Sequence, residues 1–259
     1  MTEQKYVYDA AWEGERTRLA AIEALWDTGS RALLSELGVG PHARVLEVGA
    51  GGGALVEWMA GQVGPQGRVL ATDIDTRFLM PLEGGPVAVA QHDITSGPPP
   101  EDGFDIAHAR LLVEHLPDPR AAIANIAAAV RPGGWVVIED YDWTGFGADP
   151  PDPLADRVGR GVLGFMASAG FNPAYGRRVA SDVAAAGLVD VTAEGRLRVI
   201  GEDHPGFAFF TLSVAQLKEP AVKMGALSAE DADAFIARVE QGGLRVITPA
   251  VVAASGRRP

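Results

Sequence analysis

The chain contains no cysteine, which excludes disulfides, thiolate metal sites and a cysteine nucleophile. It also lacks an uninterrupted apolar run of about 18 residues, the length that indicates a membrane-spanning helix. Its first residues, MTEQKYVYDAAWEGERTRL, have no apolar stretch typical of a signal peptide. We therefore expect a cytoplasmic protein that does not act on a membrane.

The sequence has fewer basic than acidic residues: 22 Lys and Arg compared with 34 Asp and Glu, which gives a net charge of −12. This charge repels a phosphate backbone and an anionic lipid surface. Nucleic acid is thus a poor candidate ligand, and we expect a small-molecule partner. A homodimer stays open as an alternative to a monomer.

What is present is an ordinary globular balance over 259 residues, with 47% hydrophobic and 22% charged residues. One domain with a modest appendage is the default at this length. Apolar residues at helical spacing in residues 1–42 predict a helical N-terminal cap, in which Tyr6, Tyr8 and Trp12 could close over a ligand. Short apolar runs then alternate with the helical stretches Leu55–Gln62 and Arg120–Val130, a pattern typical of a parallel sheet. The predicted strands are Arg44–Val48, Gly67–Ala71, Val87–Gln91, Phe104–Ala109, Trp135–Glu139, Val189–Ile200 and Leu244–Ser255.

The strongest local signal is VLEVGAGGGALVEWMA, a strand, a glycine-rich turn and a helix. Gly49 and Gly51 allow a tight turn and close approach of a ligand, and the helix start presents free amides. The same glycines, with Ala54 and with Asp73 further on, also satisfy the dinucleotide fingerprint of an NAD enzyme. The loop alone therefore leaves two cofactors open.

Glu47, two residues before the first glycine, favours one of them. Its carboxylate would face the negative charge of an NAD pyrophosphate, whereas S-adenosylmethionine (SAM) carries a cationic amine and a sulfonium. The stretch LEVGAGGG resembles the first motif of the class I SAM-dependent methyltransferases. The resemblance extends from Arg44 to about Glu139, where it includes FDIAHARLLVEHLPDP and RPGGWVVIED, and it continues weakly into the closing strands.

The resemblance implies a Rossmann-like, doubly wound sheet of seven strands, mostly parallel with an antiparallel last strand. It also implies a SAM site in which Asp73 holds the ribose hydroxyls and Asp93 accepts from the adenine amino group, with Ile74 and Ile94 beside the ring. The remaining cofactor residues that we expect are Glu47, Gly49, Ala50 and Gly51 of the loop, and Ala109 and Arg110 at the methionine part.

Two residues are candidates for the chemistry. His115 follows the fourth strand and could take a proton from an acceptor. Asp140, at the end of the fifth strand, could orient the acceptor, because functional side chains gather at strand ends. The neighbouring acid Asp142 raises a metal-assisted alternative, but the fourth strand ends in HAR and offers no matching carboxylate, so we expect no metal.

The sequence thus predicts one methyltransferase domain over 1–259, with a SAM-binding core at 43–140 and acceptor-side insertions at 141–180 and 202–243. The predicted reaction is methyl transfer from SAM to oxygen or nitrogen of a small organic molecule. A SAM-binding protein that has lost transfer, acting as a cyclase or a sensor, and an NAD-dependent oxidoreductase are the alternatives.

Overall fold

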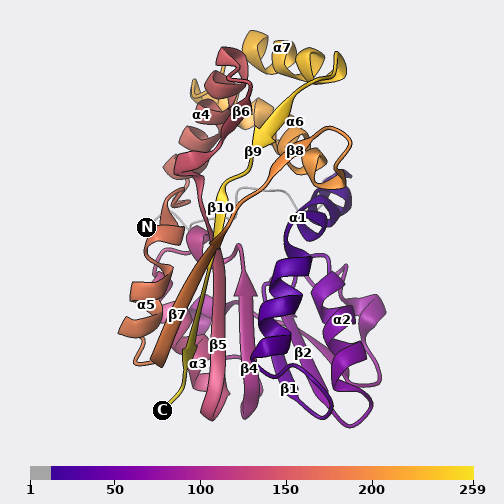
Figure 1. The fold of residues 1–259 in the computed structure, drawn as a ribbon, viewed down its shortest axis with the longest axis vertical. Helices are drawn as coiled ribbons and strands as arrows, with labels where there is room; N and C mark the ends of the chain where they lie inside the picture. Colours follow the sequence, from indigo (N-terminus) through magenta and orange to yellow (C-terminus); the bar gives the residue numbers. More distant parts are fainter. Residues whose placement is uncertain (1–12) are drawn as a thin grey trace.

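The computed structural model describes residues 13–259, so Tyr6, Tyr8 and Trp12 lie outside the described residues. Figure 1 shows a large sheet in the lower half and a smaller group of helices and short strands above it. The α-helices are α1 (Glu15–Glu36), α2 (Ala54–Val63), α3 (Pro119–Ala129), α4 (Pro153–Ser168), α5 (Val179–Ala185), α6 (Ala208–Met224) and α7 (Ala229–Glu240). The strands are β1 (Arg44–Val48), β2 (Arg68–Asp73), β3 (Val87–Gln91), β4 (Phe104–Arg110), β5 (Val130–Asp142), β6 (Gly147–Asp149), β7 (Val189–Arg196), β8 (Val199–Gly201), β9 (Arg245–Ile247) and β10 (Ala250–Arg257).

The large sheet has seven strands in the order β3-β2-β1-β4-β5-β10-β7. The pairs from β3 to β5 are parallel, and β10 runs antiparallel between β5 and β7. The predicted fold class, a mostly parallel sheet of seven strands with an antiparallel last strand, is confirmed. The order reverses between β1 and β4, which is where ligands bind in open α/β sheets.

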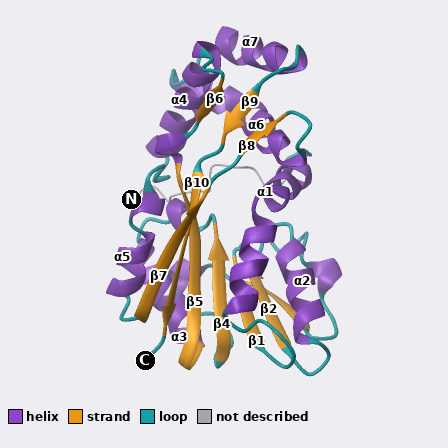
Figure 2. Ribbon diagram, viewed as in Figure 1, coloured by secondary structure: helices purple, strands orange, loops and turns teal. Residues whose placement is uncertain are grey.

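Helices cover both faces of this sheet (Figure 2). Along β1 the side chains alternate, so Val45 packs under α1 and α2 while Leu46 packs on the opposite side with α3 and α5. Local capping fixes where several helices begin. The Asp118 carboxylate accepts a hydrogen bond from Ala121 N, and Pro119 occupies the first turn of α3.

The second group is built from α4, α6 and α7 with a three-stranded sheet in the order β6-β9-β8. It stands above the carboxyl ends of the parallel strands (Figure 1). Its core is rich in aromatic rings and is continuous with the upper half of α1, for example through Trp26 and Phe209. The segments 141–180 and 202–243 supply its helices, so they lie at the end of the sheet where a ligand is expected.

The prediction of single strands over Val189–Ile200 and Leu244–Ser255 was wrong: each segment forms two strands in different sheets. The two segments leave the large sheet together. Where they cross, Thr248 N donates to the carbonyl of Arg198, and Arg198 N donates to Thr248 Oγ1. Pro249 follows Thr248 and has no N–H to donate, which favours a break in the strand at this point. Within residues 13–259, no helix combines the length and apolarity needed to cross a membrane.

Candidate functional site

A cavity of about 520 Å³ opens at the carboxyl ends of β1 to β4. The glycine loop (residues 49–53) forms its floor, together with the segments that follow β2, β3 and β4. Helix α1 lies across it and contributes Glu15, Arg18, Leu19, Ile22 and Glu23. The cavity therefore sits at the reversal of strand order, with α1 as its roof.

The glycine loop turns sharply because Gly49 and Gly51 adopt φ values of 69° and 54°, a region that side chains disfavour. Asp73, at the end of β2, holds this turn. One carboxylate oxygen accepts from Gly51 N at 2.9 Å and the other from Asp75 N at 3.1 Å. Burial raises the pKa of Asp73 against the effect of these amides. Ile74 beside it is 54% exposed, and both residues line the cavity.

Asp93 begins the short turn after β3 and also lines the cavity. Its Oδ1 accepts from Thr95 N at 2.8 Å and from Thr95 Oγ1 at 2.7 Å. Ile94 lies between these two residues and is buried. The carboxylate is thus held rigidly at the rim of the cavity, one strand away from Asp73.

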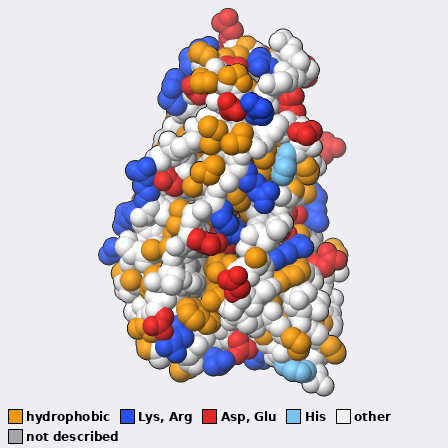
Figure 3. Space-filling model, in the orientation of Figure 1, with side chains coloured by type: hydrophobic (Ala, Val, Ile, Leu, Met, Phe, Trp, Pro, Cys, Tyr) orange, Lys and Arg blue, Asp and Glu red, His pale blue; other side chains and the backbone are white. Residues whose placement is uncertain are grey.

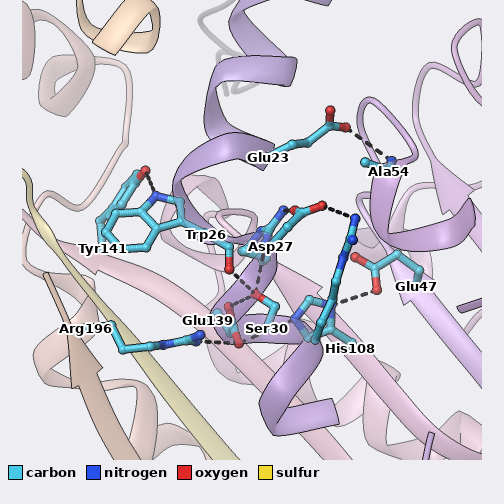
Figure 4. Close-up of polar contacts among 12 residues, drawn as sticks. Glu23, Trp26, Asp27, Ser30, Glu47, Ala54, His108, Glu139, Tyr141 and Arg196 are labelled. Atoms are coloured by element: carbon cyan, nitrogen blue, oxygen red, sulfur yellow. Dashed lines mark hydrogen bonds and ion pairs between the residues drawn. The ribbon is translucent and has the colours of Figure 1, made fainter. Parts of the chain in front are cut away.

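Glu47 lines the cavity but does not present a bare carboxylate (Figure 4). Its Oε2 lies 2.7 Å from Nδ1 of His108, its register partner on β4, and both side chains are buried. Burial alone would lower the pKa of His108, but Glu47 and Glu139 outweigh it and hold that pKa above its ordinary value. His108 is therefore the hydrogen-bond partner of the Glu47 carboxylate, and the two acids beside it favour its protonated form.

Arg110 lies at the end of β4, and its guanidinium points to α1. It donates to Asp27 Oδ1 at 2.8 Å and to Ser30 Oγ at 2.9 Å, and it lines the cavity. The neighbouring Ala109 is 1% exposed and packs in the core on the α3 side. The structure thus brings Arg110 to the cavity, but not the side chain of Ala109, because successive residues of a strand face opposite sides of the sheet.

His115 lines the cavity beyond β4. Its ring lies 4.8 Å from that of Phe171, and Nε2 is 3.8 Å from Oε1 of Glu114. Burial, assisted by the charge of Arg18, lowers the pKa of His115 to about 3. The imidazole is therefore neutral near pH 7 and is a weak base in this setting.

The structure does not bring Asp140 to the cavity, so its expected role at the acceptor is not supported. The side chain is fully buried, next to Glu114. Burial raises the pKa of both carboxyls well above their ordinary values. Asp142 points elsewhere and pairs with Arg177 at 2.9 Å. Among the described residues, no group of three His, Cys, Asp or Glu side chains is arranged to hold a metal ion.

Sequence reasoning missed the residues of α1. Glu15, Leu19, Glu23 and Asp27 follow one another at intervals of four, so they share one face of a helix. This spacing could have indicated a polar helix face, but it does not indicate which part of the protein that face covers. The structure shows that it covers the cavity.

The cavity lining carries more negative than positive groups. The acids are Glu15, Glu23, Glu47, Asp73, Asp75 and Asp93, and the guanidinium groups are Arg18 and Arg110. In addition, the Glu23 carboxylate accepts from Ala54 N at the start of α2, the position that binds phosphate in dinucleotide-binding proteins. The site therefore favours a ligand with positive charge over a pyrophosphate.

Comparison with known proteins agrees with this geometry. The family model described as "Methyltransferase domain" matches residues 17–191. Methyltransferase str2 of Strobilurus tenacellus is 36% identical over 115 residues, which cover 42% of this chain and 40% of that protein. The ubiquinone/menaquinone biosynthesis C-methyltransferase UbiE of Cupriavidus taiwanensis is 30% identical over 114 residues, 42% of this chain and 47% of that protein. The matches thus span less than half the length of these curated relatives.

Among solved structures, a putative methyltransferase from Bacillus halodurans superposes with a TM-score of 0.58 at 16% identity, over 90% of this chain and 99% of that one. Phosphoethanolamine N-methyltransferase 2 of Haemonchus contortus, in complex with SAM, gives a TM-score of 0.55 at 16% identity. That match covers 90% of this chain and 53% of the other. At these identities the likeness establishes the fold.

Proposed function

The chain belongs to the methyltransferase-domain family, and from this membership we propose that it transfers a methyl group from SAM to oxygen or nitrogen of a small organic molecule. The observation that carries the proposal is the acidic cavity between the glycine loop and α1. Relatives named for C-methylation and for O-methylation are both similar to this chain, so the acceptor atom has to be measured.

The residues around the cavity fit SAM. Gly49 and Gly51 let the loop backbone approach a ligand without side chains in the way. Each oxygen of Asp73 accepts one amide and has a further lone pair for a ribose hydroxyl. The exposed Ile74 offers an apolar surface for the adenine ring, and Asp93 a carboxylate for its amino group. Glu47, Ala50, Ile94 and Arg110 also line the cavity, so that of the expected cofactor residues only Ala109 is not among the lining residues.

When bound, SAM supplies an electrophilic methyl group on a sulfonium. The chain's contribution is to exclude water and to orient the acceptor. Leu111, Leu112 and Leu116 line the cavity beside His115 and make this end apolar. Because burial keeps the imidazole neutral, we propose that His115 orients the acceptor through a hydrogen bond and does not hold its proton.

The segments 141–180 and 202–243 stand above this end of the sheet, and we propose that they select the acceptor. The decisive test is incubation of the purified chain with methyl-labelled SAM and a panel of phenols, amines and carboxylic acids. We expect S-adenosylhomocysteine (SAH) to form only when an acceptor is present, with the label on oxygen or nitrogen of the product. Binding of SAM without SAH formation across the panel would favour a cyclase or a sensor.

A further inference from the structure

Among residues 13–259, Glu23 is the acid of the cavity roof that bonds to the start of α2, directly after the glycine loop (Figure 4). Its Oε1 accepts a hydrogen bond from Ala54 N at 3.2 Å. Arg16, two turns earlier on α1, donates to the carbonyl of Gly52. Helix α1 is thereby fixed to both sides of the loop, and the Glu23 carboxylate is held inside the cavity.

The sequence of the loop makes room for this carboxylate. Gly52 does not have the positive φ of its neighbours, so the turn itself does not require glycine there. A Cβ at Gly52 would, however, collide with Oε1 of Glu23. A substituted residue 52 would push the carboxylate out of the cavity, which gives Gly52 a role that the turn geometry does not explain.

Glu23 differs in its charge balance from three acids near it on α1 and β1, namely Glu15, Asp27 and Glu47. Glu15 pairs with Arg18 at 2.7 Å, Asp27 with Arg110 at 2.8 Å, and Glu47 with His108 at 2.7 Å. Within residues 13–259, the Glu23 carboxylate has only the amide of Ala54 as a hydrogen-bond partner and forms no ion pair. Burial raises the pKa of Glu23, the amide of Ala54 lowers it, Asp27 raises it, and the charges of Arg16 and Arg110 lower it. Arg16 and Arg110 act without an ion pair to Glu23, so no cation of the described residues is in direct contact with this carboxylate.

Resting on the proposed function, we infer that Glu23 binds the α-ammonium group of SAM. Glu47, which sequence reasoning assigned to the cationic end of SAM, already has the buried His108 as its hydrogen-bond partner. An ammonium group at Glu23 would bring a positive charge into direct contact with the carboxylate and would supply three hydrogen-bond donors. Helix α1 would then contribute a cofactor residue as well as the roof of the cavity.

The test compares three ligands by calorimetry on the full chain and on Glu23→Gln. SAM and SAH carry the ammonium group, whereas 5′-methylthioadenosine lacks the amino-acid part and keeps the adenosine. Glutamine can still accept from Ala54 N, so the loop contact is retained. We expect the Kd of SAM and of SAH to rise roughly 10- to 100-fold, the effect of losing a charged hydrogen bond, with about the same affinity for methylthioadenosine.

Glu36→Gln is the matched control, because Glu36 is an exposed acid on the same helix and lies outside the cavity. It should leave all three affinities unchanged. Retained binding of methylthioadenosine shows that the Glu23 variant is folded with its adenosine site intact. Equal weakening of all three ligands, weakening of SAM alone, or no change would each overturn the inference. Failure of the wild-type chain to bind SAM would instead contradict the proposed function itself.

Discussion

At the scale of single residues, the surroundings of each carboxylate determine what it can do. Asp73 faces two backbone amides and keeps lone pairs toward the cavity. Glu47 is tied to a buried histidine, and Asp140 is enclosed with no access to a ligand. Three acids at strand ends thus differ in role: Asp73 can bind a ligand, Glu47 is hydrogen-bonded to His108, and Asp140 is buried away from the cavity.

Asp73→Ala is expected to weaken SAM binding at least about tenfold, because the contact to the ribose hydroxyls and the hold on Gly51 are both lost. Calorimetric titration measures the change. Asp102→Ala, which removes an exposed acid outside the cavity, should bind SAM like the wild type. An unchanged affinity of Asp73→Ala for SAM would contradict the assignment of Asp73 to the ribose hydroxyls.

His115→Ala is expected to lower turnover about 10-fold or more, the lower range for a lost positioning or proton-transfer group, with SAM affinity retained. The pKa of about 3 keeps the imidazole neutral from pH 5 to 8. The pH–rate profile of the wild type should therefore show no change in slope near pH 6.5 that is due to His115. Rates of both proteins across this range test the assignment. A limb near pH 6.5 that disappears in the variant would show that His115 acts as the base.

At the scale of elements, helix α1 both packs on the sheet and forms the roof of the cavity (Figure 4). Trp26 Nε1 donates to the hydroxyl of Tyr141 at 2.7 Å, and Ser30 Oγ donates to Glu139 at 2.6 Å. Arg196 of β7 reaches the same carboxylate at 2.7 Å. The contacts of Trp26 and Ser30 fix the helix to β5, and Arg196 joins β7 to the same carboxylate, so the position of Glu23 over the glycine loop follows from the packing of α1 on β5.

The turn after β4 packs against β5 through two buried acids, Glu114 and Asp140. Because their pKa values are raised in the fold, the folded chain holds protons that the unfolded chain releases above pH about 4.5. The fold therefore loses stability as pH rises from there through the raised pKa values. A neutral residue at position 114 should remove part of this loss.

Glu114→Gln is thus expected to be more stable than the wild type at pH 8, by about 1 kcal/mol or roughly 2–4 °C in Tm. The difference should shrink toward pH 5, because the raised pKa values favour the protonated wild-type carboxyls as pH falls. Thermal unfolding at both pH values measures it, with the exposed Glu240→Gln as control. A difference of the same size at both pH values would contradict the pKa account.

At the scale of the whole molecule, the alternation of strands and helices was enough to predict the parallel sheet, and the ends of β1 and β3 were correct to the residue. Local patterns could not show that residues 189–200 and 244–255 cross between two sheets, because the break depends on Arg198 meeting Thr248. Nor could they show that Asp140 is buried. Asp140 lies at a strand end, where we expected a ligand, but α1 and the segment around Tyr175 cover β5 from both sides.

The net charge of −12 has different effects at the surface and in the cavity. On the face drawn in Figure 3, basic side chains are interspersed with acidic ones. Inside the cavity the six acids outnumber the two guanidinium groups, Arg18 and Arg110. The overall charge sets what the surface repels, whereas this local excess sets the sign of the ligand that the site prefers.

The central claim is that this cavity takes SAM and not a dinucleotide, and parallel calorimetric titrations with SAM, SAH and NAD test it most directly. The account predicts saturable binding of SAM and SAH with Kd on the order of micromolar and no saturation with NAD. Saturable binding of NAD without binding of SAM would contradict it, and would change the reaction class to hydride transfer.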